Sequence, residues 1–147
     1  MAKIQFFSEG TEFSISRPAS VIRWIKRVIT SEGFVPGVLN IIFCNDDGLK
    51  EINVAFLNHH TYTDIITFDH SEEPGRIEGD IFISIDRIGE NATNLNISFE
   101  DELHRVIIHG ILHLMGYSDK APTDKQQMRL KEDACLLLRN VPRGTVK

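Results

Sequence analysis

Two histidines, His109 and His113, stand four residues apart in an apolar stretch of the chain. If the stretch is helical, both side chains lie on one face about 6 Å apart along the axis, so both imidazoles can reach one ion. Gly116 permits the positive φ that ends a helix, and the turn after it can bring Asp119 back toward the rings. The spacing therefore predicts a metal site with three protein ligands.

A site with three protein ligands leaves the fourth position of a tetrahedral zinc ion open. An open position is typical of a catalytic site, because a water bound there has its pKa lowered to about 7 and becomes a usable nucleophile. Two histidines in an apolar helix can also be satisfied core residues, but the glycine and carboxylate that follow favour metal binding. We expect one zinc ion, or another divalent transition metal, and a hydrolase.

The run from His109 to Asp119, HGILHLMGYSD, resembles the signature of the YbeY family of rRNA maturation factors, H-G-x-L-H-L-x-G-Y-x-H. Residues 63–68 (TDIITF) and 79–81 (GDI) are similar to two further motifs of that family. The resemblance implies a metal-dependent endoribonuclease that cleaves single-stranded RNA, with metal-activated water or hydroxide hydrolysing a phosphodiester. It further implies a role in rRNA maturation and ribosome quality control, with ribosomal RNA and the small ribosomal subunit as partners.

Two positions depart from the family pattern. Asp119 stands where a third histidine is usual, but a carboxylate oxygen binds zinc at nearly the imidazole distance, so we retain it as a ligand. Its charge should make the bound water a weaker acid. An ungapped reading places Leu57, followed by Asn58, His59 and His60, where many members have an Arg that could hold phosphate. No catalytic Arg is therefore carried over.

Other polar residues could either take part in function or have an ordinary surface or turn-forming role. Four further histidines belong to this group: His59, His60, His70 and His104. The first two could donate a proton or contact phosphate, but all four are more typical of solvated surface groups. Asp64 and Asp80 could orient a ligand or substrate, or could simply form turns at strand starts.

Two other functions are compatible with the histidine pair. In zinc peptidases of the metzincin type a Glu directly follows the first histidine and acts as general base, and here that position is Gly110. The second alternative is a non-catalytic or weakly catalytic ribosome assembly factor stabilised by its metal. A closed site with four protein ligands would favour the structural role.

The elements that must position these residues mix helices and strands, so the expected fold is α+β: a single small domain over residues 1–147, with a mixed β-sheet packed against several helices. The metal site then lies on a helix and the turn after it. Helices are predicted at 18–31, from Asp46 or Asp47 to about Phe56, at 98–116 and from Thr123 onward. Strands are predicted at 38–44, 64–68 and 79–85, with an edge strand or hairpin in the first sixteen residues and a polar turn at 69–76.

Capping residues mark the ends of two of these helices. Ser98 with Asp101 resembles a capping box that opens the histidine helix, and Thr123 with Gln126 is a candidate for the last helix. That last helix is predicted to bury Met128, Cys135 and Leu138 and to expose Lys125, Arg129, Lys131 and Glu132.

Composition restricts the function further. A formal net charge of −5 argues against a protein that coats nucleic acid, so RNA would have to be held by local basic patches. Arg23, Lys26 and Arg27 form one candidate patch, although a solvated helix face is the favoured interpretation. No apolar run approaches the length of a membrane span and no signal peptide is evident, which predicts a cytoplasmic protein. Cys44 and Cys135 are expected to be buried.

Overall fold

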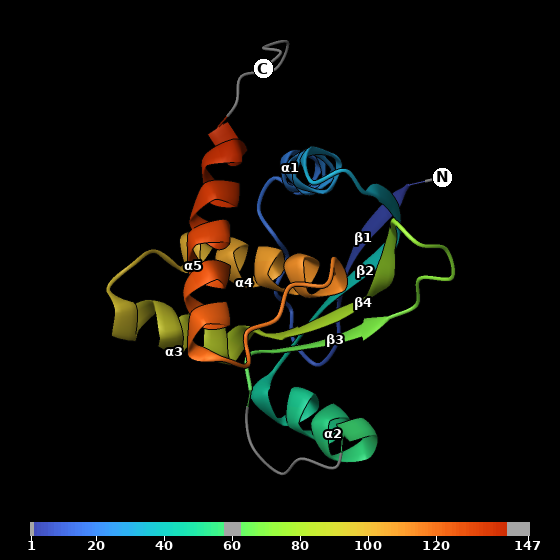
Figure 1. Ribbon diagram of the computed structural model, residues 1–147. Helices are drawn as coiled ribbons and strands as arrows, with labels where there is room; N and C mark the ends of the chain where they lie inside the picture. Colours follow the sequence, from blue (N-terminus) through green and yellow to red (C-terminus); the bar gives the residue numbers. More distant parts are fainter. Residues whose placement is uncertain (1, 58–62, 141–147) are drawn as a thin grey trace.

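The computed structural model describes residues 2–57 and 63–140, and Figure 1 shows their arrangement. The described strands are β1 (Lys3–Ser8), β2 (Val35–Cys44), β3 (Ile65–Asp69) and β4 (Arg76–Ser84). The described helices are α1 (Pro18–Ser31), α2 (Asp46–Leu57), α3 (Ile85–Leu95), α4 (Phe99–Leu114) and α5 (Pro122–Leu137), followed by the short 3-10 helix η1 (Leu138–Asn140).

The strands form one mixed sheet in the order β1-β2-β4-β3. β1, β2 and β4 run parallel, whereas β3 is antiparallel to β4, and the turn-rich segment between them joins these neighbours as predicted. The first sixteen residues were predicted to form an edge strand or a hairpin, and they contribute a single edge strand, β1. The predicted α+β class with a mixed sheet is confirmed.

Helices cover the two faces of the sheet unequally (Figure 1). Because side chains alternate along a strand, Leu39, Ile41 and Phe43 of β2 enter the main core, which α1 and α4 complete. The opposite face carries a smaller cluster in which Cys44 and Ile66 pack with Leu49 of α2. The larger layer is therefore the one that contains the histidine helix.

Helix α4 begins and ends where its sequence predicts. The Ser98 hydroxyl accepts a hydrogen bond from the backbone N–H of Asp101 at 3.0 Å, which caps the helix start. At the other end Gly116 has φ +102°, a conformation that glycine adopts without strain. In the middle, a Cβ at Gly110 would lie 2.8 Å from Ile65 Cδ1 and 3.2 Å from Ile81 Cγ2. The glycine thus lets α4 approach the sheet closely.

Several predictions about the helices were wrong. Helix α3 was not predicted, and it buries only Ile88 and Ala92. Helix α5 begins at Pro122 with Ala121 as N-cap, so Thr123 and Gln126 do not form its capping box. Met128 and Cys135 are buried as expected, while Leu138 is only partly buried. Within the described part of the chain, no helix is long and apolar enough to cross a membrane.

Candidate metal centre

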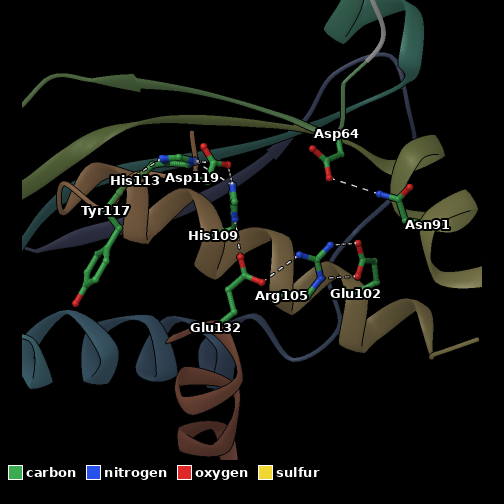
Figure 2. A network of polar contacts seen from close by, with 9 residues as sticks. All are labelled: Asp64, Asn91, Glu102, Arg105, His109, His113, Tyr117, Asp119 and Glu132. Atoms are coloured by element: carbon green, nitrogen blue, oxygen red, sulfur yellow. Dashed lines mark hydrogen bonds and ion pairs between the residues drawn. The ribbon is translucent and has the colours of Figure 1, made fainter. Parts of the chain in front are cut away.

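The structure brings His109, His113 and Asp119 together at the C-terminal part of α4 (Figure 2). The two Nε2 atoms lie 3.0 Å apart. Asp119 Oδ2 lies 3.2 Å from His109 Nε2 and 3.4 Å from His113 Nε2. Their side chains are 18%, 28% and 37% exposed, respectively, so the three groups converge at a place that solvent can reach.

The three donor atoms have nearly the spacing that a zinc ion requires. Ligands at about 2.0–2.2 Å from a tetrahedral ion stand about 3.3–3.6 Å from one another. The separations of 3.0, 3.2 and 3.4 Å lie within this range or a few tenths of an ångström below it. Among the described residues this is the group of three that could hold a metal ion, and it consists of the residue types that zinc prefers.

Each histidine ring is held through its other nitrogen. His113 Nδ1 lies 3.1 Å from the backbone oxygen of Tyr117, in the turn that follows α4. His109 Nδ1 lies 2.6 Å from Glu132 Oε2 on α5. Both contacts leave Nε2 directed toward the shared point, which is how metal-binding histidines are usually supported.

The contact with Glu132 corrects a prediction. The last helix was expected to expose Glu132, but the residue is 2% exposed and lies against α4. Its second oxygen, Oε1, accepts a hydrogen bond from Arg105 Nη1 at 3.1 Å. Arg105 in turn makes two bonds to Glu102, which is fully buried. The site therefore has a buried ionic network behind it.

The turn that carries Asp119 is anchored to two helices. The Tyr117 hydroxyl donates to Glu32 Oε1 at 2.6 Å, at the C-terminal end of α1. Lys131 of α5 binds the other oxygen of Glu32, also at 2.6 Å, and lies over the Tyr117 ring. The hydrogen bond and the ion pair fix the position from which Asp119 reaches the histidines.

Electrostatics around the triad shift several pKa values. Burial lowers the pKa of His109, but its hydrogen bond and ion pair with Glu132 outweigh that effect and the pKa is raised. Burial raises the pKa of Asp64, and the nearby His109 and Arg105 offset only part of this. Asp64 immediately precedes β3 and contacts Asn91 at 3.5 Å (Figure 2). Its carboxyl group therefore holds a proton more readily than an ordinary aspartate.

The other candidate residues lie away from the triad or outside the described residues. Asp80 is bonded to His70 at 3.1 Å and to Asn40 at 3.0 Å, and its neighbour Ile81 faces α4, so Asp80 points to the opposite face of the sheet. His70 is 58% exposed, as expected. His104 was expected at the surface, but it is 8% exposed, packs on Trp24 and is bonded to Arg139.

Asn58, His59 and His60 lie outside the described residues. Arg27 of the basic α1 face donates to Leu138 O at 2.7 Å, so it links α1 to η1. Both cysteines are buried, as predicted, and burial raises the pKa of each thiol to about 11.

Comparison with known proteins identifies the family. A profile of the family "Endoribonuclease YbeY" matches residues 6–139. The chain is 50% identical over 136 residues to Endoribonuclease YbeY of Cytophaga hutchinsonii, an alignment that covers 92% of this chain and 95% of that protein. It is 49% identical over 127 residues to the protein of the same name from Flavobacterium johnsoniae, covering 86% and 91%.

A solved structure shows a similar fold. The solution structure of TM1509 from Thermotoga maritima matches with a TM-score of 0.65 at 26% identity, and the alignment covers 98% of this chain and 100% of that one. Together with the sequence matches over nearly the whole chain, this places the protein in the endoribonuclease YbeY family.

Proposed function

We propose that the protein is a metal-dependent endoribonuclease that hydrolyses single-stranded RNA, with one zinc ion held by His109, His113 and Asp119. The observation that carries the proposal is the convergence of three zinc-type donor atoms at separations of 3.0 to 3.4 Å. Three protein ligands leave one position for water or substrate, as in catalytic zinc sites. The activity is supported by the relatives, which are named as endoribonucleases.

The residues of the chain have distinct parts in this proposal. The triad binds the ion, and when bound, zinc would activate water and withdraw charge from a phosphodiester. With a formal net charge of −5 on the chain, the phosphate has to be held locally, next to the ion, rather than by the general field of the protein.

The position after the first histidine disfavours the peptidase alternative. A peptidase of the metzincin type needs a Glu there, but Gly110 faces Ile65 and Ile81 of the sheet, where even a Cβ would be crowded. The helix surface next to His109 therefore serves packing against β3 and β4. We propose ribosomal RNA as the substrate and the small ribosomal subunit as the partner, with a cytoplasmic location, on the strength of family membership.

The test is cleavage of a defined single-stranded RNA by the purified protein, with chelator and after zinc is restored. We expect cleavage to stop with chelator, to return with zinc, and to fall about 100-fold or more in His113→Ala. His70→Ala is the matched control, because His70 is an exposed histidine outside the triad, and it should cleave like the wild type. Cleavage that survives both chelator and His113→Ala would refute the proposal. Zinc binding without any cleavage would instead favour the assembly-factor alternative.

A further inference from the structure

A buried chain of charged side chains runs from the candidate metal centre into the protein (Figure 2). His109 Nδ1 contacts Glu132 Oε2 at 2.6 Å, and Glu132 Oε1 contacts Arg105 Nη1 at 3.1 Å. The Arg105 guanidinium then forms a two-pronged contact with Glu102. Glu132 is 2% exposed and Glu102 is fully buried, so water does not compete for these contacts.

The hydrogen-bonding capacity of these groups assigns the proton on His109. Glu132 Oε1 accepts a hydrogen bond from Arg105 Nη1 at 3.1 Å in a buried setting, and this fixed positive charge favours the ionised carboxylate. An ionised carboxylate only accepts hydrogen bonds, so the facing Nδ1 must carry a hydrogen. In a neutral ring Nε2 then carries no hydrogen, and its lone pair points toward Asp119 and His113. This tautomer is the one that can bind a metal through Nε2.

Arg105 prevents any other arrangement of Glu132. A guanidinium group only donates, so it requires an acceptor atom on the side of Glu132 that it faces. Its Nε and Nη2 atoms donate to Glu102, and its side chain is 15% exposed. One oxygen of Glu132 is therefore committed to Arg105 and the other to His109.

We propose that Glu132 is a positioning residue that selects the metal-binding tautomer of His109, and that Arg105, fixed by Glu102, holds Glu132 in that orientation. The inference rests on the proposed metal centre. It distinguishes the two histidines: His113 is supported by the neutral backbone carbonyl of Tyr117, whereas His109 is supported by a buried charge. Asp119 also faces His109 Nε2, but at 3.2 Å and 37% exposed it is the weaker acceptor.

The substitution Glu132→Gln separates this role from mere packing, because glutamine has nearly the same shape. Its amide has one accepting oxygen and one donating nitrogen, and Arg105 requires the oxygen. The amide nitrogen would then face His109 Nδ1 and donate to it. This favours the tautomer that carries its hydrogen on Nε2 and cannot bind the ion. Loss of such a partner typically lowers metal affinity 10- to 100-fold, and we expect a zinc affinity lower by about that factor.

The experiment measures zinc affinity by competition with a chelator, and records the ring ¹⁵N shifts of His109 in the metal-free protein at a pH where the ring is neutral. Asp133→Asn is the matched control, since it removes the same charge from the next position of α5 at an exposed site. The control should keep zinc affinity within about twofold of wild type. Glu132→Gln should move the hydrogen of His109 from Nδ1 to Nε2, a change that a purely structural role would not produce.

A second variant covers the case in which Glu132→Gln does not fold. Arg105→Lys keeps the positive charge but lacks the planar fork, so it cannot serve both carboxylates, and zinc affinity should fall about tenfold. Folded variants of either kind that bind zinc within twofold of wild type, with the hydrogen still on Nδ1 in Glu132→Gln, would overturn the inference. A wild-type protein that binds no zinc would instead refute the metal centre itself, so the two failures are distinguishable.

Discussion

Asp119 gives the candidate metal centre a negative charge that a third histidine would not supply. Its carboxylate meets both Nε2 atoms from a turn whose neighbour Tyr117 is tied to Glu32. An anionic ligand cancels one unit of the charge on a bound zinc ion, so a water on that ion is a weaker acid than it would be with three neutral ligands. On the proposed function, the identity of this one residue would therefore set the pH range of cleavage.

This argument predicts the behaviour of Asp119→His. The variant restores the full double positive charge of the ion, and the pH at which RNA cleavage rises should move to lower values. The measurement is the cleavage rate against pH for both proteins at matched zinc occupancy. A midpoint that does not move would mean that Asp119 does not bind the ion, or that another step limits the rate.

The residues of the candidate site differ in how far the sequence reveals them. His109, His113 and Asp119 lie within eleven consecutive residues, so helical spacing and one glycine are enough to predict that they converge. Glu132 comes from another helix, and its position depends on how α5 crosses α4. A charged residue between other charged residues has the pattern of a solvated helix face, and only its partners Arg105 and His109, which lie on another helix, offset the cost of burying it. Local pattern therefore could not predict this part of the site.

Helix α4 depends on one small residue for its position against the sheet. At Gly110 a Cβ would lie 2.8 Å from Ile65 Cδ1 and 3.2 Å from Ile81 Cγ2. An added methyl group has to push the helix away from β3 and β4 or displace both isoleucines. The histidines on the same helix would move with it.

We predict that Gly110→Ala lowers the free energy of unfolding. Overpacking of a core typically costs about 1–3 kcal/mol, which exceeds the gain of about 0.5–1 kcal/mol from removing a glycine inside a helix. Gly89→Ala in α3 is the matched control, because its Cβ would meet only Phe99 Cε2 at 3.9 Å, and it should be neutral or stabilising. Urea unfolding of the two variants provides the measurement. Equal effects at both positions would show that α4 adjusts without cost.

The elements were predictable to the extent that their apolar patterns are strong. Helix α1 buries Val21, Trp24, Ile25, Val28 and Ile29, and its predicted range of 18–31 is the observed one. Helix α3 does carry apolar residues at helical spacing (Ile85, Ile88, Ala92 and Leu95), but it is short and contains Gly89, Asn91 and Asn94, which disfavour helices, and it was not predicted. The order of the strands is a further property that local pattern does not contain, since β4 lies between β2 and β3 only in the folded sheet.

The main core joins segments from both ends of the described chain. It includes Ile4 of β1 and Val28 of α1 as well as Met128 and Cys135 of α5. Trp24, which is 2% exposed, donates from Nε1 to the backbone oxygen of Cys135 at 2.8 Å. Apolar burial on this scale is the kind of contribution that stabilises a small domain without a metal ion.

We therefore predict that the protein stays folded when its metal is removed. Chelator-treated protein should keep the near-ultraviolet circular dichroism of Trp24 and should unfold cooperatively in urea. Zinc at about 100 times its dissociation constant should add about 2.7 kcal/mol to the free energy of unfolding. Loss of the Trp24 signal on chelation would assign the metal a structural role and would favour the assembly-factor alternative.

Because α5 follows α4 in the chain, the ligands and their supporting residues are synthesised at different times. A chain is synthesised from its N-terminus, so His109 and His113 leave the ribosome before Lys131 and Glu132, which complete the support of the turn and of the first ring. Until α5 docks, the three ligands are present in the chain but the groups that hold them are not. On the proposed function, a nascent chain in which α5 has not yet docked would therefore have an unsupported metal centre.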